Sequence, residues 1–160
     1  MESRLRVLFL CTGNTCRSPM AEALLKAELG VDAARVEVMS AGLRAAEGDP
    51  AAPFSFEVAS RHGIDLGAHR SRRATPELIA TSDLVLVMEP SHRVQAGAMG
   101  AAADTCHVMS EWPPPGEPDL GISDPYGGSR EGYEECWRRI AHHVKRIAPH
   151  IIEAIRSQSK

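Results

Sequence analysis

A cysteine and an arginine stand six positions apart near the N-terminus, at Cys11 and Arg17. A loop of this length between a strand and a helix can curl so that successive backbone N–H groups point inward and bind an anion. The helix that follows adds the positive end of its dipole, and a guanidinium can grip two phosphate oxygens. The segment therefore predicts a phosphate site in which Cys11 faces the phosphorus as a thiolate nucleophile. The other members of this loop are Thr12, Gly13, Asn14, Thr15, Cys16 and Ser18.

The spacing of Cys11 and Arg17 is significant because of the strand and the helix that flank it. A buried strand at residues 7–10 precedes the loop. A helix opened by Ser18 and Pro19 follows it, with the proline at its first helical position. The alternative makes Cys11 a buried strand-end residue and Arg17 a surface charge. That alternative does not explain two neighbouring residues that tolerate positive φ, Gly13 and Asn14, inside the loop. No Gly-Lys-Ser/Thr follows, so this is not a Walker phosphate loop.

Phosphoryl transfer to a cysteine also needs a proton donor for the leaving group. The candidate is Asp124, which opens the sequence Asp-Pro-Tyr-Gly-Gly at residues 124–128. Pro125 stiffens the chain after this carboxyl, and the glycines allow the loop to fold over a pocket. Alone the sequence is typical of a surface turn, whereas together with the cysteine loop it indicates a general acid.

The stretch at residues 7–23 and the sequence Asp-Pro-Tyr-Gly at residues 124–127 together resemble the low-molecular-weight protein-tyrosine phosphatases. The resemblance covers nearly the whole chain, with both motifs at their expected ends. It implies a single flavodoxin-like domain over residues 1–160, built on a four-stranded parallel sheet with helices on both faces. It also implies a phosphorylated protein as substrate, inorganic phosphate as product, a cysteinyl-phosphate intermediate, and catalysis without a metal or other cofactor.

The same resemblance assigns roles to individual residues. Cys11 would be the nucleophile, Arg17 would bind phosphate and the transition state, and Asp124 would act as acid and then as base. Ser18 would hydrogen-bond the thiolate and ease its departure in the second step. Asn14 would hold the loop in its strained shape, and the residues that support it would be Ser40 and His69.

Two departures from the tyrosine-specific members concern the substrate. Those members usually place a branched apolar residue where this chain has Thr15, and an aromatic residue in the loop after the second strand. Residues 43–50 contain no aromatic residue. Thr15 and the sequence around Tyr126 resemble the bacterial protein-arginine phosphatases instead, and these two residues are the predicted substrate-pocket residues. The pattern favours phosphoarginine over phosphotyrosine, while a neutral Ile-to-Thr exchange in a phosphotyrosine enzyme is the alternative.

Three further hypotheses concern cysteine chemistry. A related sheet serves as a phosphocysteine carrier in sugar-uptake systems, but Arg17 together with an acid loop favours hydrolysis. Arsenate-reducing relatives need a further cysteine pair about seventy residues after the nucleophile, and residues 80–99 contain no cysteine. Finally, the recurrence of the pair in the family makes Cys16 the predicted redox partner of Cys11, through a reversible disulfide.

The elements that must position these residues alternate along the chain. Apolar runs predict strands at 36–39, 84–88 and 105–109 in addition to 7–10. Helices are expected from Ser18 to Gly30, at 53–62, near 75–77, from Pro90, and over a long stripe from Tyr133 to Ile155. Pro149 should kink or split the last helix. Alternating strands and helices predict a parallel sheet covered on both faces.

Composition excludes several other classes. The chain has 160 residues, 43% of them hydrophobic, and a formal charge of −3, which argues against nucleic acid as a partner. No apolar run reaches the roughly 20 residues of a membrane span, and the N-terminus does not resemble a signal peptide. The other two cysteines, Cys106 and Cys136, show no zinc-site spacing with nearby histidines, and a disulfide framework is disfavoured. We therefore expect a cytoplasmic protein without a membrane partner.

Overall fold

The computed structural model describes residues 4–116 and 121–158. One sheet of four parallel strands lies at the centre, in the order β2-β1-β3-β4. This confirms the predicted parallel α/β sheet. The observed strands are longer or shorter than their apolar runs by a few residues: β1 (Leu5–Cys11), β2 (Val36–Gly42), β3 (Leu84–Val87) and β4 (Cys106–Val108).

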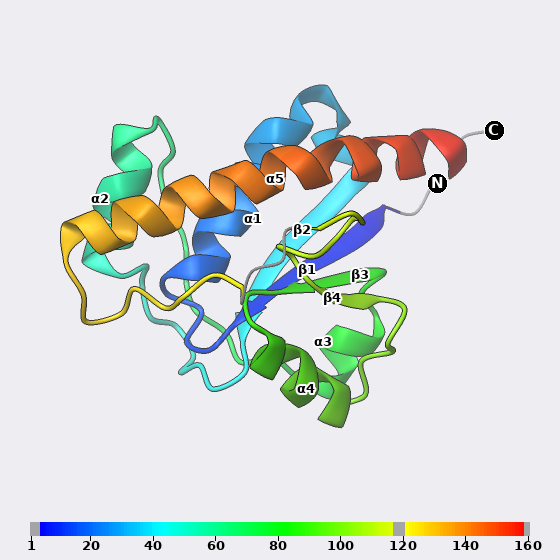
Figure 1. The fold of residues 1–160 in the computed structure, drawn as a ribbon, viewed down its shortest axis with the longest axis horizontal. Coiled ribbons are helices and arrows are strands. Elements are labelled where there is room, and N and C mark those ends of the chain that lie inside the picture. Colours follow the sequence, from blue (N-terminus) through cyan, green and yellow to red (C-terminus); the bar gives the residue numbers. More distant parts are fainter. Residues whose placement is uncertain (1–3, 117–120, 159–160) are drawn as a thin grey trace.

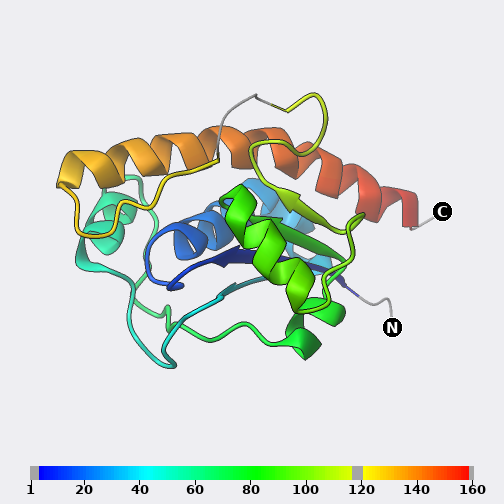
Figure 2. The same ribbon diagram turned by 60° about the horizontal axis from the view of Figure 1, so that its bottom comes forward.

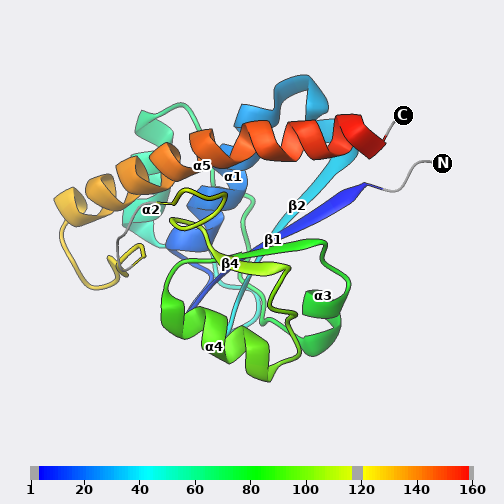
Figure 3. The same ribbon diagram turned by 45° about the vertical axis from the view of Figure 1, so that its right-hand side comes forward.

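Helices cover both faces of the sheet, as Figures 1 and 3 show. Two helices lie on one face, α1 (Arg17–Leu29) and the long α5 (Arg130–Gln158), and α2 (Pro53–Arg61) packs against them. The opposite face carries α3 (Pro76–Ala80) and α4 (Pro90–Ala98). A short 3₁₀ helix, Gly30–Arg35, joins α1 to β2.

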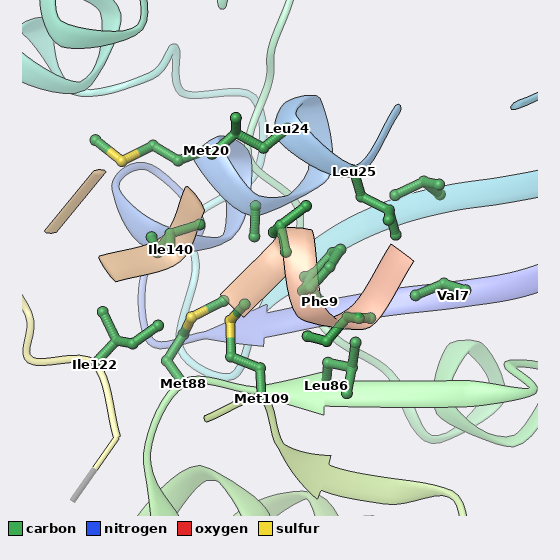
Figure 4. Close-up of a cluster of buried hydrophobic side chains, with 14 of the residues drawn as sticks. Val7, Phe9, Met20, Leu24, Leu25, Leu86, Met88, Met109, Ile122 and Ile140 are labelled. Carbon is green, nitrogen blue, oxygen red and sulfur yellow. The ribbon is translucent and has the colours of Figure 1, made fainter. Parts of the chain in front are cut away.

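The first strand shows why its sequence is continuously apolar. Val7 and Phe9 belong to the core on the side of α1 and α5, whereas Leu8 and Leu10 belong to the core on the side of α3 and α4. All four are fully buried, because successive side chains of a strand point to opposite faces and both faces are covered. Figure 4 shows the larger of the two cores, in which Phe9 lies among side chains from the helices and neighbouring strands.

Two proline expectations need correction. Pro19 is the third residue of α1 rather than its first, because the helix already begins at Arg17. Pro149 does not split the last helix, which runs from Arg130 to Gln158 with the proline inside it. The turns on both sides of Pro149 bury Ile147 and Ile151 in the core, and this packing offsets the hydrogen bond that the proline removes. Among the described helices, none combines the length and apolar character needed to cross a membrane.

Candidate active site

The loop between β1 and α1 lies at the carboxyl end of the sheet, where parallel α/β proteins bind ligands. Figure 1 shows this loop beside the segment that precedes α5. A pocket of about 210 Å³ opens here. It brings together the three predicted catalytic residues, although Asp124 is more than a hundred positions away from the other two. The pocket is lined by Cys11, Thr12, Gly13, Thr15, Cys16, Arg17, Asp124 and Tyr126.

Asn14 is the residue around which the loop turns. It has a φ of 57°, and it is the sole non-glycine residue with positive φ in the described chain, whereas Gly13 has no positive φ. Its side-chain amide donates to the hydroxyl of Ser18 at 2.8 Å and to that of Ser40 at 2.9 Å. Its side-chain oxygen accepts from the backbone N–H of Arg72, and its carbonyl accepts from His69 Nε2 at 2.6 Å. These contacts, all buried or partly buried, hold a strained backbone in place.

The sulfur of Cys11 is surrounded by donors. The backbone N–H of Asn14 points to it at 3.3 Å, and the hydroxyl of Ser18 lies 2.9 Å away. Since the Ser18 oxygen already accepts a hydrogen bond from the Asn14 amide, its own proton is available to the sulfur. Both groups can therefore donate a hydrogen bond to the nucleophilic sulfur.

Arg17 is buried, with a side chain only 2% exposed, which contradicts the alternative of a surface charge. One terminal nitrogen donates to Glu89 Oε1 at 2.7 Å and to the carbonyl of Ile122 at 2.8 Å. The other lies 3.6 Å from Asp124 Oδ2. The Arg17 Nε is buried without a hydrogen-bond partner among the described residues, so this N–H remains a donor for an anion bound beside it.

Asp124 and Tyr126 form the mouth of the pocket. The Asp124 side chain is 43% exposed, and its Oδ1 accepts from the backbone N–H of Tyr126 at 3.0 Å. Tyr126 is 76% exposed. Thr15 lines the same pocket, and its carbonyl accepts from the backbone N–H of Ala52, just before α2.

Cys16 faces both the pocket and the core. Its sulfur contacts the hydroxyl of Tyr133 at 3.5 Å, and burial raises the pKa of this thiol above its ordinary value. All four cysteines are free thiols. In residues 4–116 and 121–158, no three side chains of His, Cys, Asp or Glu are grouped as metal ligands would be.

Four residues around the loop were missed by sequence reasoning. Glu89 pairs with Arg17, and His92 Nε2 lies 3.0 Å from Thr12 Oγ1. Glu22 accepts a hydrogen bond of 2.7 Å from Ser40. The backbone of the loop lies so close to Gly42 that a Cβ there would be 2.7 Å from the Thr12 carbonyl oxygen. The nearest signal was their position at the end of a strand, at the start of the helix that follows a strand, or on the first helix, because a ligand site of this sheet is built there.

Comparison with known proteins agrees with this geometry. Residues 6–159 match the family described as low molecular weight phosphotyrosine protein phosphatase. The chain is 37% identical to the probable low molecular weight protein-tyrosine-phosphatase EpsP of Ralstonia nicotianae, over 91% of this chain and 94% of that one. It is 36% identical to the protein-arginine-phosphatase of Bacillus subtilis, over 88% and 97%.

The solved structures show the same relationship. One is the YwlE arginine phosphatase in a mutant with a phosphorylated active site serine. Its TM-score is 0.84 at 32% identity, and the match covers 92% of this chain and 95% of that one. The chain belongs to the low molecular weight phosphotyrosine protein phosphatase family and is a cysteine-dependent protein phosphatase of that class.

Proposed function

We propose that this phosphatase hydrolyses a phosphorylated protein side chain through a cysteinyl-phosphate intermediate at Cys11. The observation that carries the proposal is the convergence of Cys11, Arg17 and Asp124 on one pocket of about 210 Å³. The phosphorylated serine in the active site of the YwlE mutant supports a covalent phosphoryl–enzyme intermediate.

In the first step the Cys11 thiolate attacks phosphorus, so that an S–P bond forms and the bond from phosphorus to the leaving group breaks. The loop N–H groups and the Arg17 guanidinium, whose Nε–H has no partner among the described residues, stabilise the charge on the transferring phosphoryl group. Asp124 gives its proton to the leaving group. The dephosphorylated protein side chain then leaves the pocket.

In the second step water attacks the phosphorus of the intermediate. The Asp124 carboxylate takes a proton from this water, and the S–P bond breaks to release inorganic phosphate. Cys11 departs as a thiolate, which the Ser18 hydroxyl stabilises by donating its hydrogen bond. Asn14, with Ser40 and His69 behind it, keeps the loop in the shape that both steps need.

Phosphoarginine is the favoured substrate and phosphotyrosine is the alternative. Thr15 supplies a hydroxyl to the pocket wall, which suits a polar guanidinium, and Tyr126 is the one aromatic side chain among the pocket-lining residues. The arginine-phosphatase relative supports this choice, whereas the relative named as a protein-tyrosine-phosphatase supports the alternative. The proposed location is the cytoplasm, where the four cysteines would remain reduced.

The test is a comparison of kcat/KM for a phosphoarginine protein and a phosphotyrosine peptide, with Cys11→Ser as the inactive control. The proposal expects the larger constant for phosphoarginine. A larger constant for the phosphotyrosine peptide would assign the protein to the alternative substrate. If the protein hydrolysed none of the phosphoarginine protein, the phosphotyrosine peptide and p-nitrophenyl phosphate, the proposed reaction would be overturned.

A further inference from the structure

His92 is a buried histidine that the proposed reaction does not use. It is the third residue of α4, and this helix starts just beyond the carboxyl end of β3. His92 is only 2% exposed. Because β3 is the neighbour of β1, the first turn of α4 lies next to the loop that carries Cys11. Figure 2 shows α4 on the near face of the sheet.

The ring of His92 connects two parts of the site. Its Nε2 is hydrogen-bonded to the hydroxyl of Thr12 at 3.0 Å and lies 4.0 Å from Glu89 Oε2. The other oxygen of Glu89 binds Arg17 at 2.7 Å. One imidazole therefore contacts both the residue that follows the nucleophile and the carboxylate that anchors the phosphate-binding arginine.

The environment of the other ring nitrogen, Nδ1, shows that packing alone does not explain a histidine at this position. Nδ1 is buried and has no hydrogen-bond partner within the described residues. Burying an unpaired polar atom costs stability, and an apolar side chain of similar size would avoid that cost. The contact that an apolar side chain could not replace is the hydrogen bond to Thr12.

Burial is the main influence on the charge state of His92, and it favours the neutral ring. Burial, and then the neighbouring Arg17 guanidinium, lower the pKa of His92, while Glu89 and Asp124 act in the opposite direction. A neutral ring can hold a hydroxyl without placing a second positive charge beside Arg17. The geometry and the charge state of His92 thus agree with one role.

We propose that His92 is a positioning residue whose imidazole holds the hydroxyl of Thr12 and thereby fixes the start of the phosphate loop. The carbonyl of Thr12 is held from the other side by the backbone N–H of Arg44 at 2.9 Å. With side chain and main chain both fixed, the peptide groups after Cys11 keep their N–H donors directed into the pocket. The inference rests on the proposed function, because it takes this loop as the phosphate site.

A double-mutant cycle on phosphate binding tests this role. The affinity for inorganic phosphate is measured by calorimetry at pH 7.5 for the wild type, Thr12→Val, His92→Leu and the double variant. Each single change should weaken binding roughly 2- to 12-fold, the range of one neutral hydrogen bond. The double variant should bind phosphate with the same affinity as the single variant that binds it more weakly. Losses that multiply in the double variant would show that the two residues act independently and would overturn the proposal.

His92→Gln provides the matched control, because its amide can still reach a hydroxyl. It should bind phosphate more tightly than His92→Leu, and equal affinities would overturn the proposal. Circular dichroism checks each fold, and His92→Phe replaces His92→Leu in the cycle if the leucine variant does not fold. Phosphate binding needs no turnover. A coupled pair in a protein that fails to hydrolyse p-nitrophenyl phosphate would therefore overturn the proposed function and leave the role of His92 intact.

Discussion

The hydroxyl of Ser18 lies 2.9 Å from the sulfur of Cys11 and has its proton free for that sulfur. The amide of Asn14 donates to the Ser18 oxygen, which leaves the Ser18 proton available to the sulfur. Asn14 in turn donates to Ser40, and Ser40 donates to the carboxylate of Glu22. A connected set of hydrogen bonds thus holds the Ser18 hydroxyl beside the sulfur. The two hydrogen-bond contacts that the structure shows for this sulfur among the described residues, the Ser18 hydroxyl and the Asn14 backbone N–H, include no general base for a neutral nucleophile.

Cys11→Ser should therefore abolish turnover of p-nitrophenyl phosphate while the fold survives. A serine hydroxyl at this position would stay protonated and attack slowly, and any phosphoserine that formed would not turn over because an alkoxide is a poor leaving group. Turnover is measured by release of p-nitrophenol, and folding by circular dichroism. Cys106→Ser, on the distant strand β4, is the control and should remain active. Near-normal activity in folded Cys11→Ser protein would refute the proposed reaction.

Asp124→Asn should slow substrates with basic leaving groups more than those with acidic ones. An acid catalyst matters most when the departing group needs a proton, and such a role contributes about 10²- to 10⁴-fold. The measurement is kcat across a series of aryl phosphates of graded leaving-group pKa. An equal loss across the series would mean that Asp124 only shapes the loop, through its contact with the Tyr126 backbone.

Thr15→Ile should shift preference toward phosphotyrosine. The change replaces a hydroxyl with apolar surface in the wall of the pocket, and a site that hydrogen-bonds its substrate discriminates strongly against one that cannot pair. The readout is the ratio of kcat/KM for the two substrates. Thr15→Ser, which keeps the hydroxyl, should preserve the wild-type ratio. An unchanged ratio in Thr15→Ile would remove Thr15 as the selecting residue.

Reversible oxidation should depend on Cys16. Hydrogen peroxide oxidises the Cys11 thiolate to a sulfenic acid, which condenses with the Cys16 thiol, releases water and forms a disulfide. Both residues line one pocket, and dithiothreitol would return them to thiols. Wild type should recover fully after peroxide and dithiothreitol, whereas Cys16→Ser should become progressively unrecoverable. Equal recovery, or no peptide linking the two cysteines by mass spectrometry, would contradict the redox role.

Gly42→Ala should loosen the phosphate loop from the end of β2. A Cβ at this position would lie 2.7 Å from the Thr12 carbonyl oxygen and 2.9 Å from the Asn14 nitrogen. Such overpacking costs about 1–3 kcal/mol, so the free energy of unfolding in urea should fall and KM should rise. Gly97→Ala is the matched control, because its Cβ would meet nothing within 4 Å and alanine is favoured in a helix. Unchanged stability and KM in Gly42→Ala would disprove the close approach.

The central strands and the loop between Cys11 and Arg17 could be predicted because their signals are local. The run at residues 7–10 is apolar at every position, and the structure buries it on both faces. The split considered at Pro149 does not occur, since core packing on both sides of the proline keeps the helix continuous. The proposed support of the loop by Ser40 and His69 came from resemblance alone, because neither residue type signals such a contact.

The missed contacts share a physical reason. Glu89 is 72 positions from Arg17, and His92 is 80 positions from Thr12. Both pairs meet only because β3 lies beside β1 in the sheet, so their contact depends on strand order. The hydrophobic periodicity of either segment does not reveal the strand order. Without the strand order, Glu89 and His92 look like ordinary residues at the start of a helix.

The burial of Arg17 has a consequence for the cost of binding. Free arginine side chains populate many rotamers, and restricting them costs up to about 2 kcal/mol in conformational entropy. Here Glu89 and the Ile122 carbonyl already restrict the guanidinium, so that loss occurs when the chain folds. An anion that binds the unpaired Nε–H then encounters a donor already in position, and its binding free energy is not reduced by ordering the arginine.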